Sequence, residues 1–402
     1  MKLEPIIKDT VTLANSEIKK IADRVANTAI LAAEKVSVDP SFKAEKDSFE
    51  SIMLQRLKTF DQTKIKNIQK EVTPLAKASQ EVRSGVYGDL GKINIFDVKN
   101  VEAAVNKLEP LKIERKLLGL RTVPKNLNLS DVEIKKYLEG QSEILNTHNI
   151  TSIDAITGGG RLFSDIGQIS EDENTQLDDF QPQAVTDKLA LYIRRVKCVD
   201  ETGRASIFDP EGEYYGDDEI ALAGTSVDET GDTKKIPEFR VGNSFNDGDT
   251  KWYSPHKQWH WFSMREGGSN WPKSYYLTFI LAEKDFNGLS DFLQLLWDKV
   301  GKSVTEAVAT AVGGAVGSAL GPLGAVIGAA IGYAVAKVIE WFIKLWKDDI
   351  FPPKTISCTV PSYGARWTKN GTWGYTTSSY RTAHFYGHNG HYYIEYYWRL
   401  FS

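Results

Sequence analysis

Residues 307–336 read AVATAVGGAVGSALGPLGAVIGAAIGYAVA, thirty consecutive residues without a charged side chain. Glycine recurs at every fourth position in two runs, and each run predicts a helix with one face of small residues that lets another backbone approach closely. The two runs are Gly313, Gly317 and Gly321, and then Gly324, Gly328 and Gly332. Pro322 lies between the runs, and a Gly-Pro pair favours a turn. The stretch therefore predicts a helical hairpin, with arms over 307–320 and 325–346 whose glycine faces meet.

The length of the arms limits what this hairpin can do in a membrane. The uncharged arm over 307–320 has 14 residues, so it rises about 21 Å and is shorter than the roughly 30 Å hydrocarbon core. Amphipathic flanks extend both arms, and Trp297, Trp341 and Trp346 stand there close to lysines, as in a membrane-interface belt. Two interpretations stay open: a hairpin that inserts into a membrane, and an insert that is permanently packed on a sheet.

The sequence on the two sides of about residue 150 is built differently. Up to about 145, apolar residues recur at spacings of three and four, which predicts amphipathic helices over 6–31, 49–68 and 98–118. From about 188 onward, aromatic and β-branched residues alternate with polar ones, which is typical of antiparallel strands. Such strands are expected over 189–199, 219–223, 252–262, 275–283, 355–360 and 391–401.

These patterns predict an α+β, multidomain chain. We expect an N-terminal helical bundle over 1–147, followed by a linker over 148–187 that is rich in glycine and acidic residues. An antiparallel β-sandwich-like domain follows over 188–402. The Gly/Ala-rich hairpin and its flanks, residues 289–347, form an insert in that domain.

Composition excludes several classes of protein. With 41% hydrophobic and 25% charged residues the chain is not disordered throughout. Its net charge is −4 and its basic residues are interleaved with acids, so no nucleic-acid partner is expected. The only cysteines, Cys198 and Cys358, exclude a disulfide-dense scaffold. Each is expected in a strand, buried and unbridged.

The hairpin resembles those of a known class of proteins. In its Gly/Ala composition, lack of charge and Gly-Pro turn, 307–336 looks like the hydrophobic hairpins of colicin-type and other helical pore-forming bacterial toxins. The resemblance covers about a tenth of the chain and extends to the hairpin alone, because β-like segments flank it here. It implies a hairpin that is concealed in a soluble form and is released into a target membrane.

Catalytic signatures are mostly absent, which favours a non-enzymatic protein. The sequence has no Gly-x-Ser-x-Gly, His-Glu-x-x-His or phosphate-binding Gly-x-x-x-x-Gly-Lys-Ser/Thr motif. No cofactor is expected, apart from weak metal candidates. Histidine imidazoles suit a transition metal, and clustered carboxylates suit calcium. The same residues also fit solvated turns and loops between strands. The candidates are His384, His388 and His391 for the first, and Asp217, Asp218, Asp247 and Asp249 for the second.

Four tryptophans in the C-terminal part, Trp252, Trp259, Trp261 and Trp271, invite two interpretations. Such side chains stack on sugars or insert at a lipid interface, and they also fill hydrophobic cores. Core packing is expected for at least half of them.

The leading hypothesis is a bacterial membrane-active toxin or delivered effector whose hairpin inserts into a target membrane. Its partners would be membrane lipid, and either a delivery machine or further copies of itself. The N-terminal sequence lacks the apolar core of a cleavable signal peptide, so release by a non-classical route is expected. The alternative is a non-enzymatic binding or structural module, for glycan or calcium, in which the hairpin stays packed. A hydrolase with an unrecognised site is a third.

Overall fold

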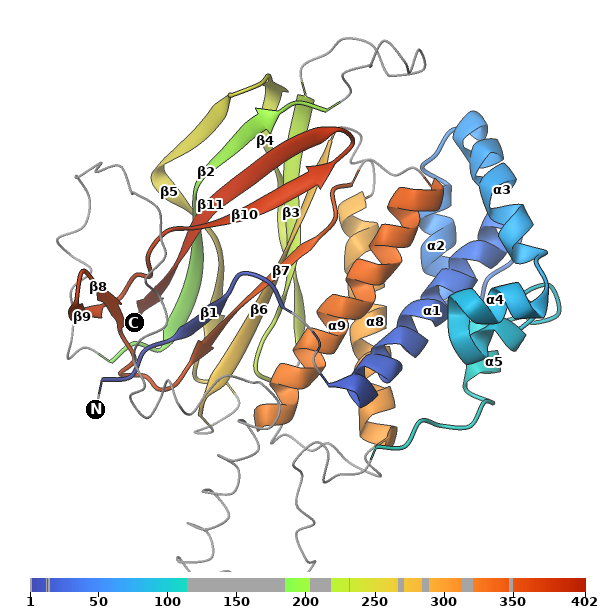
Figure 1. Ribbon diagram of the computed structural model, residues 1–402, viewed down its shortest axis with the longest axis horizontal. Coiled ribbons are helices and arrows are strands. Elements are labelled where there is room, and N and C mark those ends of the chain that lie inside the picture. The colour runs from blue at the N-terminus through green and yellow to red at the C-terminus, as the bar shows by residue number, and fades with distance from the viewer. Residues whose placement is uncertain are drawn as a thin grey trace, which may run out of the picture.

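The protein combines helices in its N-terminal part with antiparallel sheets in its C-terminal part, so the α+β class is confirmed (Figure 1). The computed structural model describes residues 2–11, 13, 15–113, 185–202, 218–230, 232–266, 271–283, 289–311, 321–346 and 350–402. The N-terminal helices are α1 (Ser16–Val38), α2 (Phe49–Leu57), α3 (Gln62–Ala76), α4 (Gln80–Tyr87) and α5 (Val101–Val105), with the 3-10 helix η1 (Gly88–Lys92) between the last two.

The strands form two larger sheets and one small one, and every neighbouring pair is antiparallel. The five-stranded sheet has the order β1 (Ile6–Lys8), β7 (Lys354–Val360), β6 (Lys273–Glu283), β3 (Asp218–Val227) and β4 (Thr233–Phe245). The four-stranded sheet has the order β10 (Arg381–Gly387), β11 (Gly390–Phe401), β2 (Lys188–Asp200) and β5 (Thr250–Ser263). The small sheet pairs β8 (Trp367–Lys369) with β9 (Thr372–Tyr375).

Strand β6 shows how the sequence places two buried layers on opposite sides of one sheet. Successive side chains of a strand point to opposite faces. Tyr275 and Leu277 belong to a buried cluster shared with the four-stranded sheet, whereas Tyr276 and Ile280 belong to a second cluster shared with the helices. Because both faces of β6 are buried, its sequence is almost continuously apolar.

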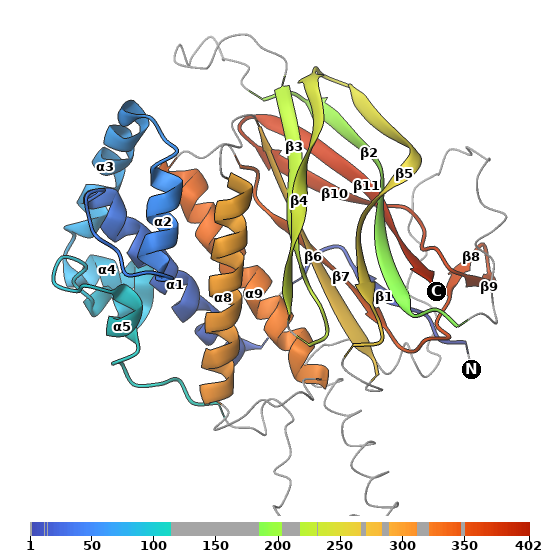
Figure 2. The same ribbon diagram turned by 180° about the vertical axis from the view of Figure 1, so that it is seen from behind.

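The second cluster joins most of the helices of the molecule. It contains residues of the N-terminal helices, of the two C-terminal helices α8 (Leu289–Ala311) and α9 (Gly321–Trp341), and of β3 and β6. In Figures 1 and 2, α8 and α9 lie between the sheets and the N-terminal helices. The boundary expected within 148–187 falls almost wholly outside the described residues, so the separate domain over 1–147 stays a prediction.

Three helix predictions are wrong in part. The run expected as one helix over 49–68 is divided into α2 and α3, because the chain turns at residues 58–61 and the Asp61 side chain caps α3. The helix expected from residue 6 begins only at Ser16, where the side chain of Asn15 accepts hydrogen bonds from the backbone N–H groups of Glu17 and Ile18. Residues Ile6–Lys8 form β1 and pair with β7, so the start of the chain belongs to a sheet. Likewise α5 ends at Val105, and Pro110 explains why the expected helix does not continue through that region.

The strand predictions are confirmed, since all six expected segments lie in β2, β3, β5, β6, β7 and β11. Cys198 in β2 and Cys358 in β7 are both buried and free, as expected. Burial raises the pKa of the Cys198 thiol to about 11. Both thiols are therefore protonated and apolar in character at neutral pH.

Candidate functional site

The predicted hairpin corresponds to α8 and α9, with α9 continuing as one turn of π-helix over Phe342–Trp346. A methyl group built on Gly301 would lie 3.7 Å from Cδ1 of Ile331. Gly301 is ten residues before the end of α8 and Ile331 is ten residues after the start of α9. This symmetric pairing is that of two antiparallel arms. The segment 312–320, with Gly313 and Gly317, lies outside the described residues.

The turn expected at Gly321-Pro322-Leu323-Gly324 is instead the first turn of α9. Proline is tolerated there because the first N–H groups of a helix have no partner within the helix, and its fixed φ suits a helix start. The prediction of a turn at these four residues is therefore wrong.

Gly328 and Gly332 of α9 face the sheet. A methyl group built on Gly328 would lie 2.7 Å from the ring of Tyr276 in β6, and one on Gly332 would lie 3.2 Å from Oγ1 of Thr355 in β7. The expectation that the two glycine faces meet is wrong for Gly328 and Gly332. The face of small residues instead lets α9 settle closely on the five-stranded sheet, where Tyr276 occupies the notch left by the missing side chain.

The other side of the hairpin is covered by the N-terminal helices. Helix α1 contacts both α8 and α9, and α2 contacts α8. The hairpin therefore lies between the five-stranded sheet and the N-terminal helices (Figures 1 and 2). Such a position conceals an apolar surface that would otherwise face water.

The three tryptophans expected at a membrane interface are buried in this structure. Trp297 on α8, Trp341 on α9 and Trp346 on the π-helical turn all belong to the helical cluster. Nε1 of Trp346 donates a hydrogen bond of 2.8 Å to Oγ of Ser37, and its ring stacks on Phe342 with 4.5 Å between centroids. These side chains anchor the end of the hairpin against α1.

A polar cluster, which we call the α1–α9 clasp, joins the two helices at a partly exposed edge. It consists of Lys19 and Asp23 on α1 and Tyr333 and Lys337 on α9. Oδ1 of Asp23 accepts hydrogen bonds from the Lys337 ammonium (2.7 Å) and the Tyr333 hydroxyl (2.9 Å). Nζ of Lys19 lies 3.5 Å from the other carboxylate oxygen and 5.4 Å from the Tyr333 ring centroid. Lys337, the first charged residue after the uncharged stretch, therefore binds α1.

The clasp keeps Asp23 charged. Burial by itself raises the pKa of this carboxyl, but the hydrogen bonds from Lys337 and Tyr333, together with the two ammonium charges, lower the pKa below its ordinary value. Sequence analysis missed the cluster because Asp23 and Lys337 are more than 300 positions apart. Only the position of Lys337 at the end of the apolar stretch signals it.

Replacing Lys337 by methionine tests the clasp. Removing one partner of a partly exposed ion pair should lower the free energy of unfolding at pH 7 by about 1 kcal/mol or less. Because the folded-state pKa of Asp23 is depressed, the clasp stabilises the fold above the unfolded-state pKa of about 3.9, and this contribution is lost as pH falls through the folded-state pKa. Denaturant unfolding of wild type and Lys337→Met should therefore differ at pH 7 and converge near pH 2.

The exposed Lys344, on the same helical arm but outside the clasp, provides the control. Lys344→Met should leave the free energy of unfolding unchanged at both pH values. An equal loss in the two variants would show that the clasp contributes nothing specific.

A buried ion pair fixes α1 closer to its C-terminal end. The Arg83 guanidinium of α4 donates to both carboxylate oxygens of Glu34 in α1, at 2.9 and 3.1 Å, and Nη1 also reaches the backbone oxygen of Leu75 at 3.1 Å. Burial raises the pKa of Glu34, although Arg83 opposes the shift. Such bidentate pairs fix orientation, so α4 and α1 form one unit.

A partly open cavity of about 380 Å³ lies between α1, α5 and α8. Ile21, Val25 and Phe49 supply apolar walls, while Arg24 and Glu306 supply charge. Arg24 is already held by Asp89 at 2.5 Å and by the backbone oxygen of Glu109 at 2.8 Å. The cavity marks a place where the N-terminal helices do not fill the space against the hairpin.

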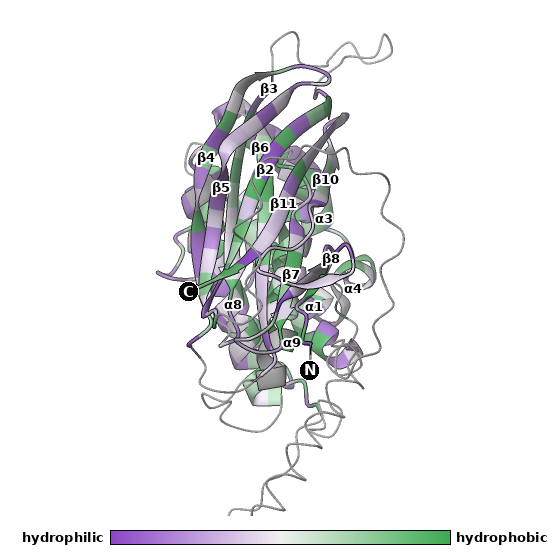
Figure 3. Cartoon of the chain, turned by 90° about the vertical axis from the view of Figure 1, so that its left-hand side faces the viewer, coloured by the Kyte–Doolittle hydropathy of each residue, from purple (hydrophilic) through white to green (hydrophobic). Residues whose placement is uncertain are grey.

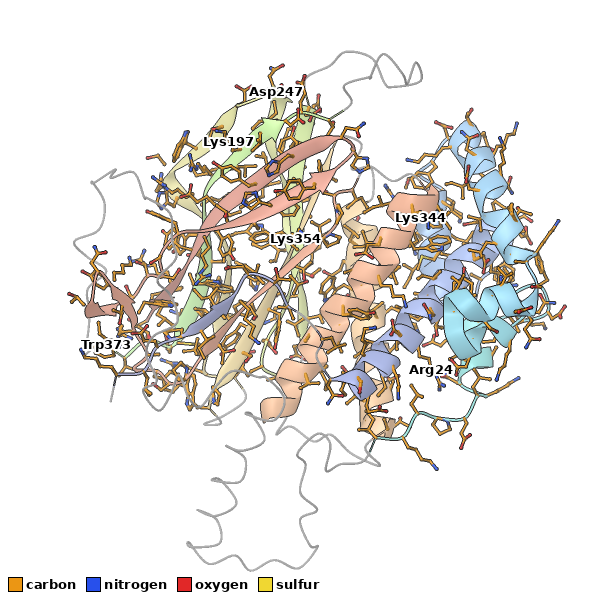
Figure 4. All side chains as sticks on the ribbon, in the orientation of Figure 1. Arg24, Lys197, Asp247, Lys344, Lys354 and Trp373 are labelled. Atoms are coloured by element: carbon orange, nitrogen blue, oxygen red, sulfur yellow. The ribbon has the colours of Figure 1, made fainter. Side chains whose placement is uncertain are left out.

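The metal candidates are scattered over the sheets. Nδ1 of His384 lies 3.0 Å from Nε2 of His391, but His388 points elsewhere, with Nε2 3.2 Å from the backbone oxygen of Ile350. Figure 4 shows Asp247 at the end of the sheets, apart from Lys344 on the hairpin arm. No three metal-ligating side chains converge within the described residues.

Of the acidic candidates, Asp218 is buried and saturated, because the N–H and hydroxyl of Thr202 and the hydroxyl of Tyr392 all donate to its carboxylate. Asp247 accepts from the N–H of Glu201 and Asp249 from that of Asn246. Asp217 lies outside the described residues. Each of the other three carboxylates thus accepts hydrogen bonds from within the protein, which accounts for its position without a metal ion. Metal binding stays a prediction.

No family model, curated protein or solved structure matches this chain. The resemblance of residues 307–336 to helical pore-forming toxins thus stays a prediction. Function has to be inferred from the chemistry and geometry of the chain itself.

Proposed function

We propose that this protein is membrane-active, a bacterial toxin or delivered effector whose hairpin of α8 and α9 leaves the soluble fold and inserts into a target membrane. The observation that carries the proposal is the second arm. Val326–Trp346 is long and apolar enough to cross a membrane by length and composition, with a mean hydropathy of 1.7. In the soluble fold, 61% of that segment is buried.

The way the hairpin is covered supports this proposal. On the sheet side Gly328 and Gly332 pack closely, and two polar contacts join β4 to α8, from Thr233 to Asp298 and from Lys235 to Asp291. On the α1 side a broad apolar contact is accompanied by further polar contacts. These include the clasp, the bond from Trp346 to Ser37, and the ion pair of 2.6 Å between Lys299 of α8 and Glu102 of α5. Polar contacts across a layer survive exposure to water at lower cost than apolar ones. We expect separation of α1 from α9 to be the step that releases the hairpin, because α1 covers the side of the hairpin that faces away from the sheet.

The same view gives each part of the chain a role. We infer that the two larger sheets, which share one buried cluster, form a β-sandwich and that the N-terminal helices form a bundle that covers the hairpin. The sandwich would be the platform from which the hairpin detaches. Lipid of the target membrane is then the partner, and release from the producing cell follows a non-classical route.

Dye release from liposomes tests the proposal. The purified protein should be monomeric without detergent and should release an entrapped dye only after a trigger, which a series across pH and calcium concentration will find. The double variant Asp23→Cys and Lys337→Cys, joined by a short bismaleimide with a reducible spacer, should release no dye under that trigger. Cys198 and Cys358 are buried, so the native protein should react at the two new sites.

Reduction of the spacer supplies the control. Cleavage should restore dye release to the level of the uncrosslinked double variant, because the tether alone prevents separation of α1 from α9. Dye release that persists in the tethered protein would show that the hairpin does not pass through this opening. A wild-type protein that releases no dye under any trigger would favour the alternative, a non-enzymatic binding or structural module with a permanently packed hairpin.

That alternative has one specific observation in its favour. Trp297 and Trp346, expected at a membrane interface, are instead fully buried parts of the helical cluster. A core of this kind is what a stable, water-soluble insert requires.

A further inference from the structure

The outer face of the four-stranded sheet exposes three large aromatic side chains. Trp252 and Trp261 of β5 are 49% and 47% exposed, and Tyr386 of β10 is 59% exposed. Figure 3 looks onto this face, with β5, β2, β11 and β10 lying side by side in front. Large exposed aromatic surfaces mark binding sites.

An irregularity in β2 concentrates charge at the middle of the face. In the pairing with β11, Glu395 lies opposite Arg195 and Tyr396 opposite Ile193, so Arg194 is an extra residue in β2, and such a bulge lets two successive residues serve one face. Arg194 and Arg195 both bind the carboxylate of Glu395 in β11, the former at 2.8 Å. Their guanidinium carbons lie 5.0 and 4.7 Å from the ring centroid of Trp252, which remains half exposed.

A second group of rings continues this surface. Tyr192 of β2 and Tyr397 of β11 stack with 5.3 Å between centroids, and the Tyr192 hydroxyl donates to Oε1 of Gln258 at 2.7 Å. Nδ1 of His256 lies 3.3 Å from the Tyr397 hydroxyl. Flat ring faces thus alternate with hydroxyl, amide and imidazole groups that both donate and accept hydrogen bonds.

The charge of the face is opposite in sign to that of the whole chain. The outward positions of β2 and β11 carry two acidic residues, Asp200 and Glu395, against five basic ones. The basic residues are Lys188, Arg194, Arg195, Lys197 and Arg399. The chain as a whole has a net charge of −4. A basic face on an acidic protein is matched to an anionic ligand.

We propose that this face binds an acidic saccharide. The apolar C–H face of a sugar ring packs on Trp252, its carboxylate or sulfate group is bound by Arg194 and Arg195, and its hydroxyls bond to Tyr192 and the exposed Gln258. The hydrogen-bonding groups of this face decide between anionic ligands. The Tyr192 hydroxyl and the Gln258 amide both donate and accept, so they suit sugar hydroxyls, whereas the phosphodiester backbone of a nucleic acid offers only acceptors.

This inference is independent of membrane insertion, so it is tested without membranes. Binding of the full-length protein to immobilised polygalacturonate, hyaluronan and heparin is compared with binding to neutral dextran, to the oligonucleotide dT15 and to phosphatidylglycerol vesicles. At least one acidic polysaccharide should bind, and dextran should not. Trp252→Ala should weaken that binding tenfold or more, and Arg195→Gln should weaken it as well.

Trp261→Ala is the matched control, because Trp261 lies on the same strand with nearly the same exposure but pairs with Ala190, whereas Trp252 pairs with Arg195, five positions or about 17 Å away along β2. Its binding should equal that of wild type, and unchanged melting temperatures should confirm that every variant folds. If Trp252→Ala unfolds the protein, Arg195→Gln carries the test alone. Equal losses at Trp252 and Trp261, tighter binding of dT15 or vesicles than of any saccharide, or binding of none of the acidic polysaccharides would overturn the proposal.

Discussion

Gly328→Leu is expected to destabilise the soluble protein by about 3 kcal/mol or more, because it inserts a side chain where α9 touches the sheet. Even a Cβ atom would lie 2.7 and 2.9 Å from two carbons of the Tyr276 ring, closer than van der Waals contact permits. Tyr276 is only 8% exposed, so its ring has little room to move aside. Denaturant unfolding at pH 7 should show the loss as a lower midpoint, with an unchanged slope if the fold is kept.

Gly85→Leu in α4 is the matched control. A Cβ atom there meets no other atom within 4 Å, and leucine is a better helix former than glycine, so stability should stay constant or rise by up to about 1 kcal/mol. In a double-mutant cycle, Tyr276→Ala should recover part of the cost of Gly328→Leu, because it removes the ring that is overlapped. If the changes in the free energy of unfolding of the two substitutions simply add, the leucine does not overlap the Tyr276 ring, and the contact between α9 and β6 is contradicted.

The elements that sequence analysis located are those with a local signal. Alternation along 391–401 identifies a strand because each side chain reports the face on which it lies, and a short continuous apolar run identifies 275–283. The long stretch without charged residues is a local signal too, and it identifies α9. In contrast, β1 is three residues long and is held by its pairing with β7, more than 340 positions away, so no local pattern marks it.

Sequence analysis identified the residues of the hairpin but not the residues that they contact. The glycine face formed by Gly328 and Gly332 indicates that another backbone or ring comes close. The pattern does not say whether this partner is the other arm of the hairpin or the sheet. The clasp has a different cause, since Asp23 gives no signal among the other surface charges of α1. On the outer sheet face, the bulge that brings Arg194 beside Arg195 depends on strand pairing, which sequence alone does not provide.

Ala329→Lys is expected to abolish dye release while leaving the soluble fold intact. Ala329 lies half-buried on α9, in a stripe with Tyr333, Lys337 and Glu340 at spacings of four, four and three. A lysine there can extend its ammonium group into water along this edge, so the free energy of unfolding should change by less than about 1 kcal/mol. Within a membrane the same charge costs roughly 3 kcal/mol, which lowers the inserted population by more than a hundredfold.

Ala329→Leu separates charge from bulk in this experiment. Leucine has a similar reach along the helix but favours the hydrocarbon core, so its dye release should equal or exceed that of wild type. Thermal unfolding of both variants shows whether the soluble fold is retained, and the liposome assay then reports on insertion alone. Wild-type dye release from Ala329→Lys would mean that this arm never enters the membrane, and the permanently packed insert would then replace the inserting hairpin.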